Sequence, residues 1–470
     1  MTAKLYTPDA VLGLDEFEQQ ALAIAEVLRE RQVAPGTRVL LKAGNSVGYL
    51  AALFALMHLG ASIVLVDQQD RPAETREICA RAGVALCLVD DDAPLAAESA
   101  RTYLYELLLA AADQRPATAA LDFSTWCALP DGLVMWSSGS TGKPKGIVKT
   151  GGSFLTNLER NAAHMGHRAD DVLLPMLPFS HQYGLSMVLI AWLARCSLVI
   201  APYRRLDHTL LMAGRCGATV LDATPATYRS MLNIIGRRPA AAAELRTVRM
   251  FCSGAAPLSP GLVDDYVAAF GLPLLDSYGS TELGNIAFAT GDNAVDCGQV
   301  MDGIGLRIVD DEGTVQPAGE IGEIEVDTPD MMTGLLLPDG TFRPAERGWY
   351  RTGDFGRLDA AGNLSVVGRK LAVHRNGYTL YPEIIEHKLA AGGVLAKVLA
   401  LPDERRGCEL VCFVEDEGQQ DRAVWRERIN ELLPVYERPN RVEVLDRFPL
   451  NRNGKPDKRQ LENLLAGAAA

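Results

Sequence analysis

The sequence predicts an α/β protein built on parallel sheets, with a smaller α+β piece toward its C-terminal end. Short β-branched runs alternate with helix-like segments between residues 37 and 90, and the alternation resumes after Gly151. This order favours parallel strands, since a parallel connection needs a crossover that a helix usually supplies. From about Gly303 the pattern changes to short β-rich pieces with Gly and Asp turns. We expect two doubly wound α/β subdomains and a small β subdomain, followed by a small α+β C-terminal domain.

The first subdomain is predicted from three strand-like runs and two helices. One helix is almost entirely apolar and should be buried, whereas the other is polar. The strands are Thr37–Lys42, Ser62–Val66 and Val84–Val89, and the helices are Val47–Leu59 and a segment near Glu74–Ala82. Residues 91–130 show little periodicity beyond a helical Ala/Leu stretch, and they lead into the next strand.

The second subdomain repeats the alternation of helices and strands. The helices are Ser186–Leu193, Leu206–Arg215, Pro225–Ile235 and Leu258–Phe270, and the strands are Ser197–Ile200, Thr219–Leu221 and Val248–Cys252. Farther on, short strands at Leu306–Val309, Glu323–Val326 and Gly362–Val367 predict the small β subdomain. A helix at Pro382–Ala391 and strands near Lys397–Leu401 and Leu410–Val414 follow. We place a domain boundary at Gly368-Arg369-Lys370, which gives an N-terminal domain of residues 1–368 and a C-terminal domain of residues 369–470.

Composition narrows the class of protein. The 470 residues carry a net charge of −13, with 30 basic and 43 acidic residues in 1–369 and 16 of each in 370–470. An acidic body argues against nucleic-acid binding and against binding to an anionic membrane, which need basic patches. Nine cysteines are scattered singly without metal-ligand spacing, so we expect reduced core thiols. The N-terminus lacks a signal-peptide pattern, and Arg195 interrupts the most apolar long run, Ser186–Tyr203, so we expect a cytoplasmic protein without integral membrane contact.

A phosphate-binding loop is predicted at Leu133–Gly146, where an apolar run breaks into Ser, Thr and Gly residues with two lysines. Glycines let backbone N–H groups approach an anion, hydroxyls donate hydrogen bonds, and lysine supplies the countercharge. A Walker P-loop does not fit, because Ser137 stands at its first glycine and Pro144 at its hydroxyl position. That proline also favours an extended path over a helical turn. Taken alone, such a stretch would be typical of a surface turn.

Three later segments carry matching chemistry. Asp276–Glu282 combines an aromatic residue beside a glycine, which suits a flat base, with a threonine for a phosphate oxygen and a glutamate for a hard cation. Gly348–Asp354 places a carboxylate in a glycine turn, where it could accept both ribose hydroxyls. Pro449–Lys455 presents one lysine on a glycine loop. Alone, these would be a loop, an Asx-type turn and a solvated lysine.

Together, in this order, the segments resemble the adenylate-forming superfamily of acyl- and aryl-CoA synthetases, peptide-synthetase adenylation domains and luciferases. The resemblance covers nearly the whole chain. It implies that a carboxylate attacks the α-phosphorus of ATP, expels pyrophosphate and forms an acyl adenylate, which a thiol then attacks. It also implies that the phosphate loop holds the β,γ end of ATP, through Ser137, Ser138, Gly139, Ser140, Thr141, Gly142 and Lys145.

The resemblance assigns further residues to ATP and to the chemistry. Thr281 would touch the α-phosphate, Glu282 would hold Mg²⁺, and Lys455 would bridge the attacking carboxylate and the α-phosphate. The residues implied for the nucleoside are Tyr278 and Gly279 with Gly254, Ala255 and Ala256 at adenine, Asp276 at its amino group, and Asp354 and Arg369 at the ribose. The resemblance also implies that residues 369–470 form a mobile lid. After adenylation this lid is expected to rotate, withdrawing Lys455 and bringing Gly377 to the site as part of a thiol tunnel. Lys370 is the hinge candidate, and no acidic residue stands between Arg369 and Gly377.

The acid is expected to lack an α-amino group. His181 stands in the region where amino-acid-activating relatives carry an aspartate, and a desolvated ammonium without a counterion would be costly. The pocket expected from the resemblance is lined by His181, Tyr183, Gly184, Ala223, Thr224, Ser253, Gly279, Leu283, Gly284 and Asn285. Asp222 leaves two interpretations open, since it could read a hydroxyl or amine on the substrate or could cap a buried turn.

The sequence therefore predicts an ATP-dependent acid–thiol ligase for an aryl or a short-to-medium acyl carboxylate. We expect coenzyme A as the acceptor and Mg²⁺ as the metal. One alternative is transfer to the phosphopantetheine of an acyl carrier protein, which offers the same thiol. From a different class, a catalytically silent nucleotide-binding protein or a luciferase-like oxygenase would share the nucleotide site.

Overall fold

The computed structural model describes residues 3–91, 93, 100–137, 145–369, 373–375, 378–403, 407–451 and 455–467. It divides into two compact units. The first comprises residues 1–255, 264–305 and 327–350, and the second comprises residues 256–263, 306–326 and 351–470. The predicted boundary at residue 369 is the end of a strand in the second unit, and the division into a body and a lid stays a prediction.

The first unit contains a sheet of eight described strands in the order β20-β19-β8-β7-β4-β3-β5-β6. The five strands from β7 to β6 in this order are parallel, as the alternation with helices predicted, whereas β8, β19 and β20 continue the sheet in antiparallel pairs. The strands are β3 Arg38–Lys42, β4 Ser62–Leu65, β5 Leu86–Val89, β6 Ala100–Tyr103, β7 Leu133–Ser137, β8 Lys145–Lys149, β19 Gly334–Leu336 and β20 Phe342–Pro344.

Helices around this sheet follow the predicted pattern in part. The apolar helix α2 is buried along its length, and Ser46 begins it by accepting a hydrogen bond from the Tyr49 N–H. Helices α1 and α6 are additions to the prediction. The helices are α1 Leu14–Glu30, α2 Val47–His58, α3 Pro72–Ala82, α4 Leu104–Ala111, α5 Ser124–Ala128 and α6 Gly151–Met165.

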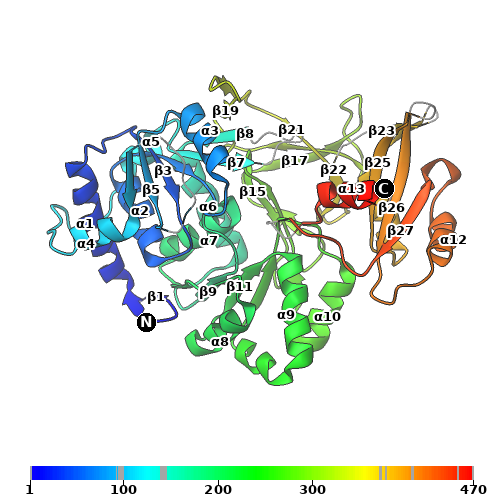
Figure 1. Cartoon of the computed structure of the whole chain (residues 1–470), viewed down its shortest axis with the longest axis horizontal. Helices are drawn as coiled ribbons and strands as arrows, with labels where there is room; N and C mark the ends of the chain where they lie inside the picture. Colours follow the sequence, from blue (N-terminus) through cyan, green and yellow to red (C-terminus); the bar gives the residue numbers. More distant parts are fainter. Residues whose placement is uncertain are drawn as a thin grey trace. The chain divides into compact units, whose positions relative to one another are not determined.

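A second sheet of the same unit has seven described strands in the order β13-β12-β11-β9-β10-β1-β2. Strands β9 to β13 are parallel, so their carboxyl ends meet at one edge. Helices α9 and α10 lie side by side (Figure 1), with the rings of Tyr228 and Tyr266 in edge contact. The elements are β1 Lys4–Tyr6, β2 Val11–Gly13, β9 Val172–Pro175, α7 Gln182–Leu193, β10 Ser197–Val199, α8 Leu206–Cys216, β11 Val220–Ala223, α9 Pro225–Arg237, β12 Met250–Ser253, α10 Pro260–Phe270 and β13 Leu274–Leu275.

Two smaller sheets follow in the chain, one in each unit. In the first unit, an antiparallel sheet follows β13 directly and is formed by β14 Ser277–Ser280, β15 Gly284–Phe288 and β16 Gln299–Val300. In the second unit, the predicted β subdomain is a sheet of β17 Gly305–Val309, β18 Gly322–Asp327, β21 Tyr350–Leu358 and β22 Leu364–Arg369. Antiparallel pairing therefore begins at β14, before the change of pattern that the sequence predicts at about Gly303.

The C-terminal part of the second unit is α+β, as predicted. Strand β26 pairs antiparallel with β25 and parallel with β27, and helix α11 packs on this sheet through Ile385 and Leu389. The elements are β23 Val373–Arg375, β24 Tyr378–Leu380, α11 Pro382–Ala391, β25 Ala396–Asp403, β26 Gly407–Glu415, α12 Arg422–Leu432, β27 Arg441–Leu445 and α13 Lys458–Gly467.

Cysteine state and membrane character can be stated for the same residues. All nine cysteines are free, and seven of them are buried. In the part of the chain that the structure describes, no helix is both long enough and apolar enough to cross a membrane.

Candidate active site

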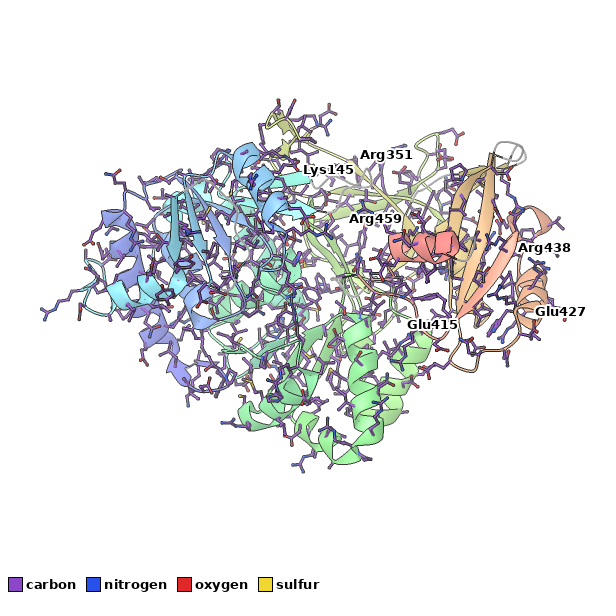
Figure 2. The ribbon with its side chains drawn as sticks, in the orientation of Figure 1. Lys145, Arg351, Glu415, Glu427, Arg438 and Arg459 are labelled. Carbon is purple, nitrogen blue, oxygen red and sulfur yellow. The ribbon has the colours of Figure 1, made fainter. Side chains whose placement is uncertain are left out.

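The predicted phosphate loop connects two paired strands. β7 and β8 run antiparallel, and Ser137 faces Lys145 at the end of the pair. A Walker loop leads from a strand into a helix, whereas the described segment after this loop is strand β8. Lys145 is the first residue of β8 (Figure 2). The predicted phosphate contacts Ser138, Gly139, Ser140, Thr141 and Gly142 lie outside the described residues, and of Ser137 only the backbone is described.

The predicted adenine segment follows the carboxyl end of β12. The Ser277 hydroxyl donates to the carbonyl oxygen of Ser253 at 2.8 Å, which joins β14 to this end of β12. A Cβ atom added to Gly254 would lie 2.6 Å from the Ser277 hydroxyl oxygen and 3.1 Å from Cε1 of Tyr183. A side chain at position 254 would therefore force the Ser277 hydroxyl or the Tyr183 ring to shift. Ala255 follows with a φ of 66°, and Tyr278 is buried in β14.

Asp276, the residue predicted at the adenine amino group, has donors on both carboxylate oxygens. Its Oδ1 accepts from the Ser277 N–H at 2.9 Å, and its Oδ2 accepts from the Cys297 thiol at 3.6 Å. Burial raises the pKa of Asp276 to about 7, against the lowering effect of these two hydrogen bonds. Near neutral pH this carboxyl group can either donate a proton or accept one.

The Thr281–Glu282 turn connects β14 to β15, and hydrogen bonds to its two backbone carbonyl oxygens hold it in place. Nζ of Lys149 donates to the Thr281 carbonyl oxygen at 3.3 Å, and the Met332 N–H donates to the Glu282 carbonyl oxygen at 2.7 Å. The Glu282 carboxylate itself makes no hydrogen bond or ion pair within the described residues. A partly exposed carboxylate in this state suits the hard-cation role expected of it, since Mg²⁺ prefers oxygen ligands.

Lys149 is a functional candidate that the sequence interpretation missed. It is fully buried at the end of β8, and burial lowers its pKa to about 8 while Asp330 and Glu282 favour its charged form. The signal was available, because a lysine that follows Ile147-Val148 in a buried strand must find a partner inside the protein. That partner belongs to a turn 132 residues farther along the chain.

Asn157 of α6 supports the same turn from another side. Its side-chain amide donates to the Asn285 carbonyl oxygen at 2.9 Å and accepts from the Asn285 N–H at 2.8 Å. It also donates to Asp330, which is 2% exposed and forms an ion pair with Arg160. Gly284 has a φ of 89° and lies so close to Asn157 that a Cβ atom would stand 2.8 Å from its amide oxygen. This network fixes the backbone on the β15 side of the turn.

Several predicted pocket residues also have backbone duties. A Cβ atom on Gly184 would lie 2.2 Å from the Pro178 carbonyl oxygen, and one on Gly279 would lie 2.8 Å from the Gly284 carbonyl oxygen. Thr224 caps α9 by accepting from the Thr227 N–H. Ala223 and Leu283 are fully buried, and the buried Ser253 hydroxyl has no hydrogen-bond partner within the described residues. Their contact with an acid stays a prediction.

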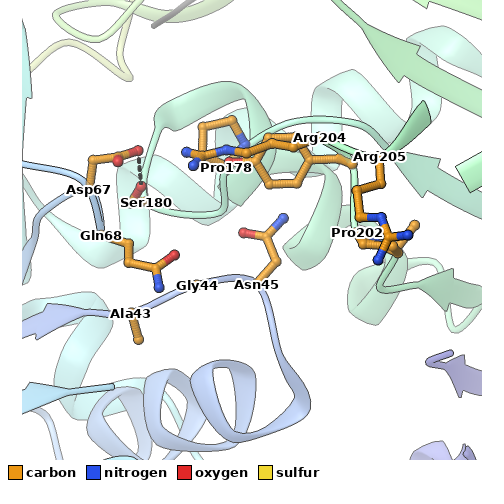
Figure 3. A pocket seen from close by; sticks show the side chains of 12 residues that line it. Ala43, Gly44, Asn45, Asp67, Gln68, Pro178, Ser180, Pro202, Arg204 and Arg205 are labelled. Atoms are coloured by element: carbon orange, nitrogen blue, oxygen red, sulfur yellow. Dashed lines mark hydrogen bonds between the residues drawn. The ribbon is translucent and has the colours of Figure 1, made fainter. Parts of the chain in front are cut away.

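His181 lies at the start of α7, beside Asp67. Its Nε2 is 3.2 Å from Oδ2 of Asp67, and the imidazole side chain is one-third exposed. Asp67 follows β4, and its Oδ2 also accepts from the Ser180 hydroxyl at 3.4 Å (Figure 3). A cavity of about 300 Å³ opens next to this pair, lined by the amides of Asn45 and Gln68, by Tyr203 and by two arginines, Arg204 and Arg205.

Tyr183 connects the acid side of the site to strand β11. Its hydroxyl donates to Oδ1 of Asp222 at 3.0 Å, while its ring lies against Gly254. Of the two interpretations of Asp222, turn capping does not apply, because Thr224 caps α9 and Tyr183 is the donor to the carboxylate. Burial raises the pKa of Asp222 to about 7, and the Tyr183 hydrogen bond opposes that rise.

This raised pKa predicts a pH-dependent stability difference. The folded state holds the Asp222 proton more tightly than the unfolded chain does. The stability that this proton contributes is therefore fully present below about pH 4 and is lost as the pH rises through about 7. Asp222→Asn cannot ionise. The unfolding free energy of the variant relative to wild type should therefore rise between pH 5 and pH 8, on the order of 2–3 kcal/mol. Denaturant titrations at both pH values measure it, and a pH-independent difference would contradict the raised pKa.

The predicted ribose and lysine residues belong to the second unit. Asp354 in β21 faces Arg369 in β22 as a direct cross-strand partner, so these two candidates are neighbours along the sheet. Lys455 is exposed and closes a turn, in which its N–H donates to the Asn451 side chain and its carbonyl oxygen accepts from the Asn451 N–H. Gly377 and the hinge candidate Lys370 lie outside the described residues.

Comparison with known proteins places the chain in a family. A model described as AMP-binding enzyme matches residues 7–336, and one described as AMP-binding enzyme C-terminal domain matches residues 394–455. The first match covers well over half of the chain. The chain belongs to the family of AMP-binding enzymes, and the family predicted from the four motifs is confirmed.

Individual relatives agree with this assignment. The chain is 28% identical to the fatty acid–[acyl-carrier-protein] ligase ScoC of Streptomyces coeruleorubidus, over 98% of this chain and 92% of the relative. It is also 28% identical to a feruloyl-CoA synthase of Amycolatopsis sp, over 94% and 91% of the two chains. The crystal structure of ATP-bound MatB from Rhodopseudomonas palustris superposes with a TM-score of 0.85 at 25% identity, covering 98% and 96%. The predicted fold and enzyme class, an AMP-forming acid–thiol ligase, are confirmed.

Proposed function

We propose that this chain is an ATP-dependent ligase that converts a non-amino aryl or short-to-medium acyl carboxylate to its acyl adenylate and transfers it to the thiol of coenzyme A. The observation that carries the proposal is a direct link between the acid side and the phosphate side of the site. Gln182, between His181 and Tyr183, donates from its side-chain amide to the Ser280 carbonyl oxygen at 2.9 Å. Ser280 immediately precedes the Thr281–Glu282 turn, so an acid held by α7 lies beside the residues expected at the α-phosphate.

Each step of adenylation has a residue suited to it. Thr281 orients the α-phosphate, and Lys455 neutralises the charge that accumulates between the attacking carboxylate and the phosphorus. Glu282 would hold Mg²⁺, which supplies charge neutralisation on the phosphate oxygens. Lys149 keeps the turn in place through the Thr281 carbonyl oxygen. Residues 137–142 and Lys145 are assigned to the β,γ end, where the leaving pyrophosphate forms.

The nucleoside and the lid residues complete the assignment. Tyr278 and Gly279 with Gly254–Ala256 take the adenine ring, and Asp276 takes its amino group. Asp354 and Arg369, which face each other across β21 and β22, take the ribose hydroxyls. The lid of residues 369–470 then turns to bring Gly377 to the thiol route, in keeping with the family's two half-reactions.

The cavity beside His181 supports coenzyme A as the acceptor. Its two arginines suit the phosphates of the coenzyme, which the phosphopantetheine of a carrier protein lacks in this form. Arg204 and Arg205 together replaced by Ala should raise the KM for coenzyme A about 5- to 10-fold, with acid-dependent ATP–pyrophosphate exchange unchanged. Steady-state thioester formation against coenzyme A concentration measures this effect. An unchanged KM would remove the cavity from the acceptor site.

Transfer to an acyl carrier protein remains the alternative, and the similarity to ScoC favours it. Parallel turnover with coenzyme A and with a holo-carrier protein separates the two acceptors. The arginine double variant sharpens the comparison, because it should slow only the reaction with coenzyme A.

Exchange of labelled pyrophosphate into ATP across a panel of aryl, fatty and hydroxy acids tests the proposal as a whole. We expect exchange that depends on the acid and is absent with α-amino acids. No acid-dependent exchange with any non-amino acid would reject the proposal and favour a silent nucleotide-binding protein. Product formation that requires oxygen would instead indicate a luciferase-like oxygenase.

A further inference from the structure

The carboxyl group of Asp222 is a buried polar group with an unused hydrogen-bonding atom. The residue is 2% exposed. Its Oδ1 accepts from the Tyr183 hydroxyl at 3.0 Å, whereas its Oδ2 has no hydrogen-bond partner within the described residues. A buried acceptor left in this state costs free energy, so such groups normally have a partner in the working form of a protein.

The surrounding fold gives Asp222 no other duty. Its neighbours on the same face of the sheet are Pro175 of β9 and Cys252 of β12. Neither of these side chains offers a cation, and no salt bridge to Asp222 occurs among the described residues. The helix that follows β11 is capped by Thr224 instead. An aspartate kept at this place is therefore unexplained by packing alone.

The location of Asp222 relates it to the acid. Tyr183 contacts Asp222 with its hydroxyl and Gly254 with its ring, so the tyrosine connects the carboxyl group to the adenine segment. Asp222 is paired with Cys252 in the sheet, two residues before Gly254. This offset puts Asp222 roughly 7 Å deeper along the strand direction than Gly254. An acid whose carboxylate lies at the α-phosphate would point its far end toward this depth.

We propose that Oδ2 of Asp222 receives a hydrogen bond from a hydroxyl or amino group on the body of the carboxylic acid, so that Asp222 determines substrate specificity. The inference rests on the proposed function and narrows its substrate to acids that carry such a donor away from the reacting carboxylate. A hydroxyl satisfies the site in either protonation state of the carboxyl group, because it both donates and accepts. An amino group satisfies the ionised state.

Discrimination should be large because it is made in a buried site. A substrate that lacks the donor leaves Oδ2 unpaired, whereas a substrate with the donor supplies its missing partner. We expect wild-type kcat/KM in ATP–pyrophosphate exchange to favour the donor-bearing acid by about 10- to 100-fold over its unsubstituted parent. Benzoic acids with hydroxyl, amino or methoxy groups at each ring position and hydroxylated and plain straight-chain acids form the panel. The aryl and alkyl arms identify which kind of body carries the donor.

Three variants separate recognition from structure. Asp222→Leu replaces the two carboxylate oxygens with two larger methyl groups and so removes the acceptor. The preference should therefore fall to within about threefold while exchange with the parent acid persists. Asp222→Asn places an amide donor near the position of Oδ2, and it should lose about 10-fold on amino-substituted acids but little on hydroxylated ones. Tyr183→Phe keeps Oδ2 and should keep the preference. Loss of the preference in Tyr183→Phe would assign recognition of the donor to the tyrosine hydroxyl instead. If Asp222→Leu does not fold, the contrast between amino and hydroxyl acids in Asp222→Asn still decides the proposal.

The outcomes distinguish this inference from the proposed function. Acid-dependent exchange with equal kcat/KM for donor-bearing and parent acids would overturn the role of Asp222 and leave the ligase intact. Equal losses on all acids in the Asp222 variants would assign the residue a structural role and also overturn it. No exchange with any acid would reject the ligase, and this inference with it.

Discussion

Lys455→Ala is expected to lower acid-dependent ATP–pyrophosphate exchange by about 100-fold or more, the usual loss when a charge that stabilises the transition state is removed. The same variant should form the thioester from supplied acyl adenylate and coenzyme A at a rate within about threefold of wild type, since the lid is expected to withdraw Lys455 before transfer. Lys455 is exposed at the end of a turn, so its truncation leaves no cavity and should not change folding.

Arg459→Ala is a matched control for this experiment. Arg459 is an exposed cation in the first turn of α13, four residues beyond Lys455 (Figure 2). Its removal changes the net charge of the lid by the same amount and should leave both half-reactions unchanged. Equal losses of both half-reactions in Lys455→Ala would contradict a lid that works in two orientations, because the lysine would then serve a single shared state.

Several central strands of the two main sheets could be predicted from local sequence, whereas β1, β2, β6, β8, β9, β19 and β20 were not predicted. The runs at Arg38–Lys42 and Ser62–Leu65 are short and apolar, and helices separate them, so their parallel pairing follows from chain connectivity. Pro144 predicted an extended path in place of a Walker loop, and the next described segment is strand β8. Helix α1 was missed although Phe17, Ile24 and Leu28 lie on one buried side of it. Alanines fill much of that side, and they weaken the apolar periodicity that marks a helix.

The candidate site could be predicted only as separate segments. Motif order identified Asp354 and Arg369 as a pair, and the structure makes them cross-strand neighbours. The contacts of Asp222 with Tyr183 and of His181 with Asp67 depend on which strand ends lie side by side, and no local pattern specifies this. The sequence therefore suggested that Asp222 had either of two roles, and the tertiary contacts removed one.

Two buried carboxyl groups of the first unit have raised pKa values. Asp222 and Asp276 each have a pKa raised to about 7 by burial, and each belongs to a segment expected at the acid or at the adenine ring. Perturbed carboxyl groups often cluster at functional sites, because a ligand supplies the partner that the empty protein lacks. Asp276 already has two protein donors, whereas Asp222 has one. The larger unmet demand at Asp222 favours it as the residue that discriminates among acids.

Lys149→Met is expected to lower acid-dependent exchange about 10- to 100-fold while the protein stays folded. Methionine fills the buried volume but cannot donate to the Thr281 carbonyl oxygen, so the turn that positions Glu282 loses its support. Stability should change little, because removing a buried ammonium also removes its desolvation cost. Asp330, the nearby buried carboxylate, keeps its ion pair with Arg160. Exchange kinetics and thermal unfolding of the same preparation measure both effects.

Lys42→Met is the matched control, since Lys42 is also fully buried in the eight-stranded sheet. Its Nζ donates to the Asp70 carbonyl oxygen and the Thr75 hydroxyl, and not to the Thr281–Glu282 turn. We expect Lys42→Met to alter stability and to leave exchange per folded molecule unchanged. Equal effects of the two substitutions on exchange would show that burial of any lysine matters, and would remove Lys149 from the site.

The pKa of Lys149 adds a test by pH. Burial lowers it from 10.5 to about 8, so the folded protein loses this proton at a lower pH than the unfolded chain does. The cost of burying the charge is therefore complete below about pH 8 and is relieved as the pH rises toward 10.5. Exchange should follow the opposite course and fall as the pH rises through about 8, because a neutral amine donates more weakly to the turn and no longer offsets the negative charge near Glu282. Exchange by Lys149→Met should not show this decline. If the exchange rate of the variant falls above about pH 8 as it does in wild type, the decline comes from the titration of another group.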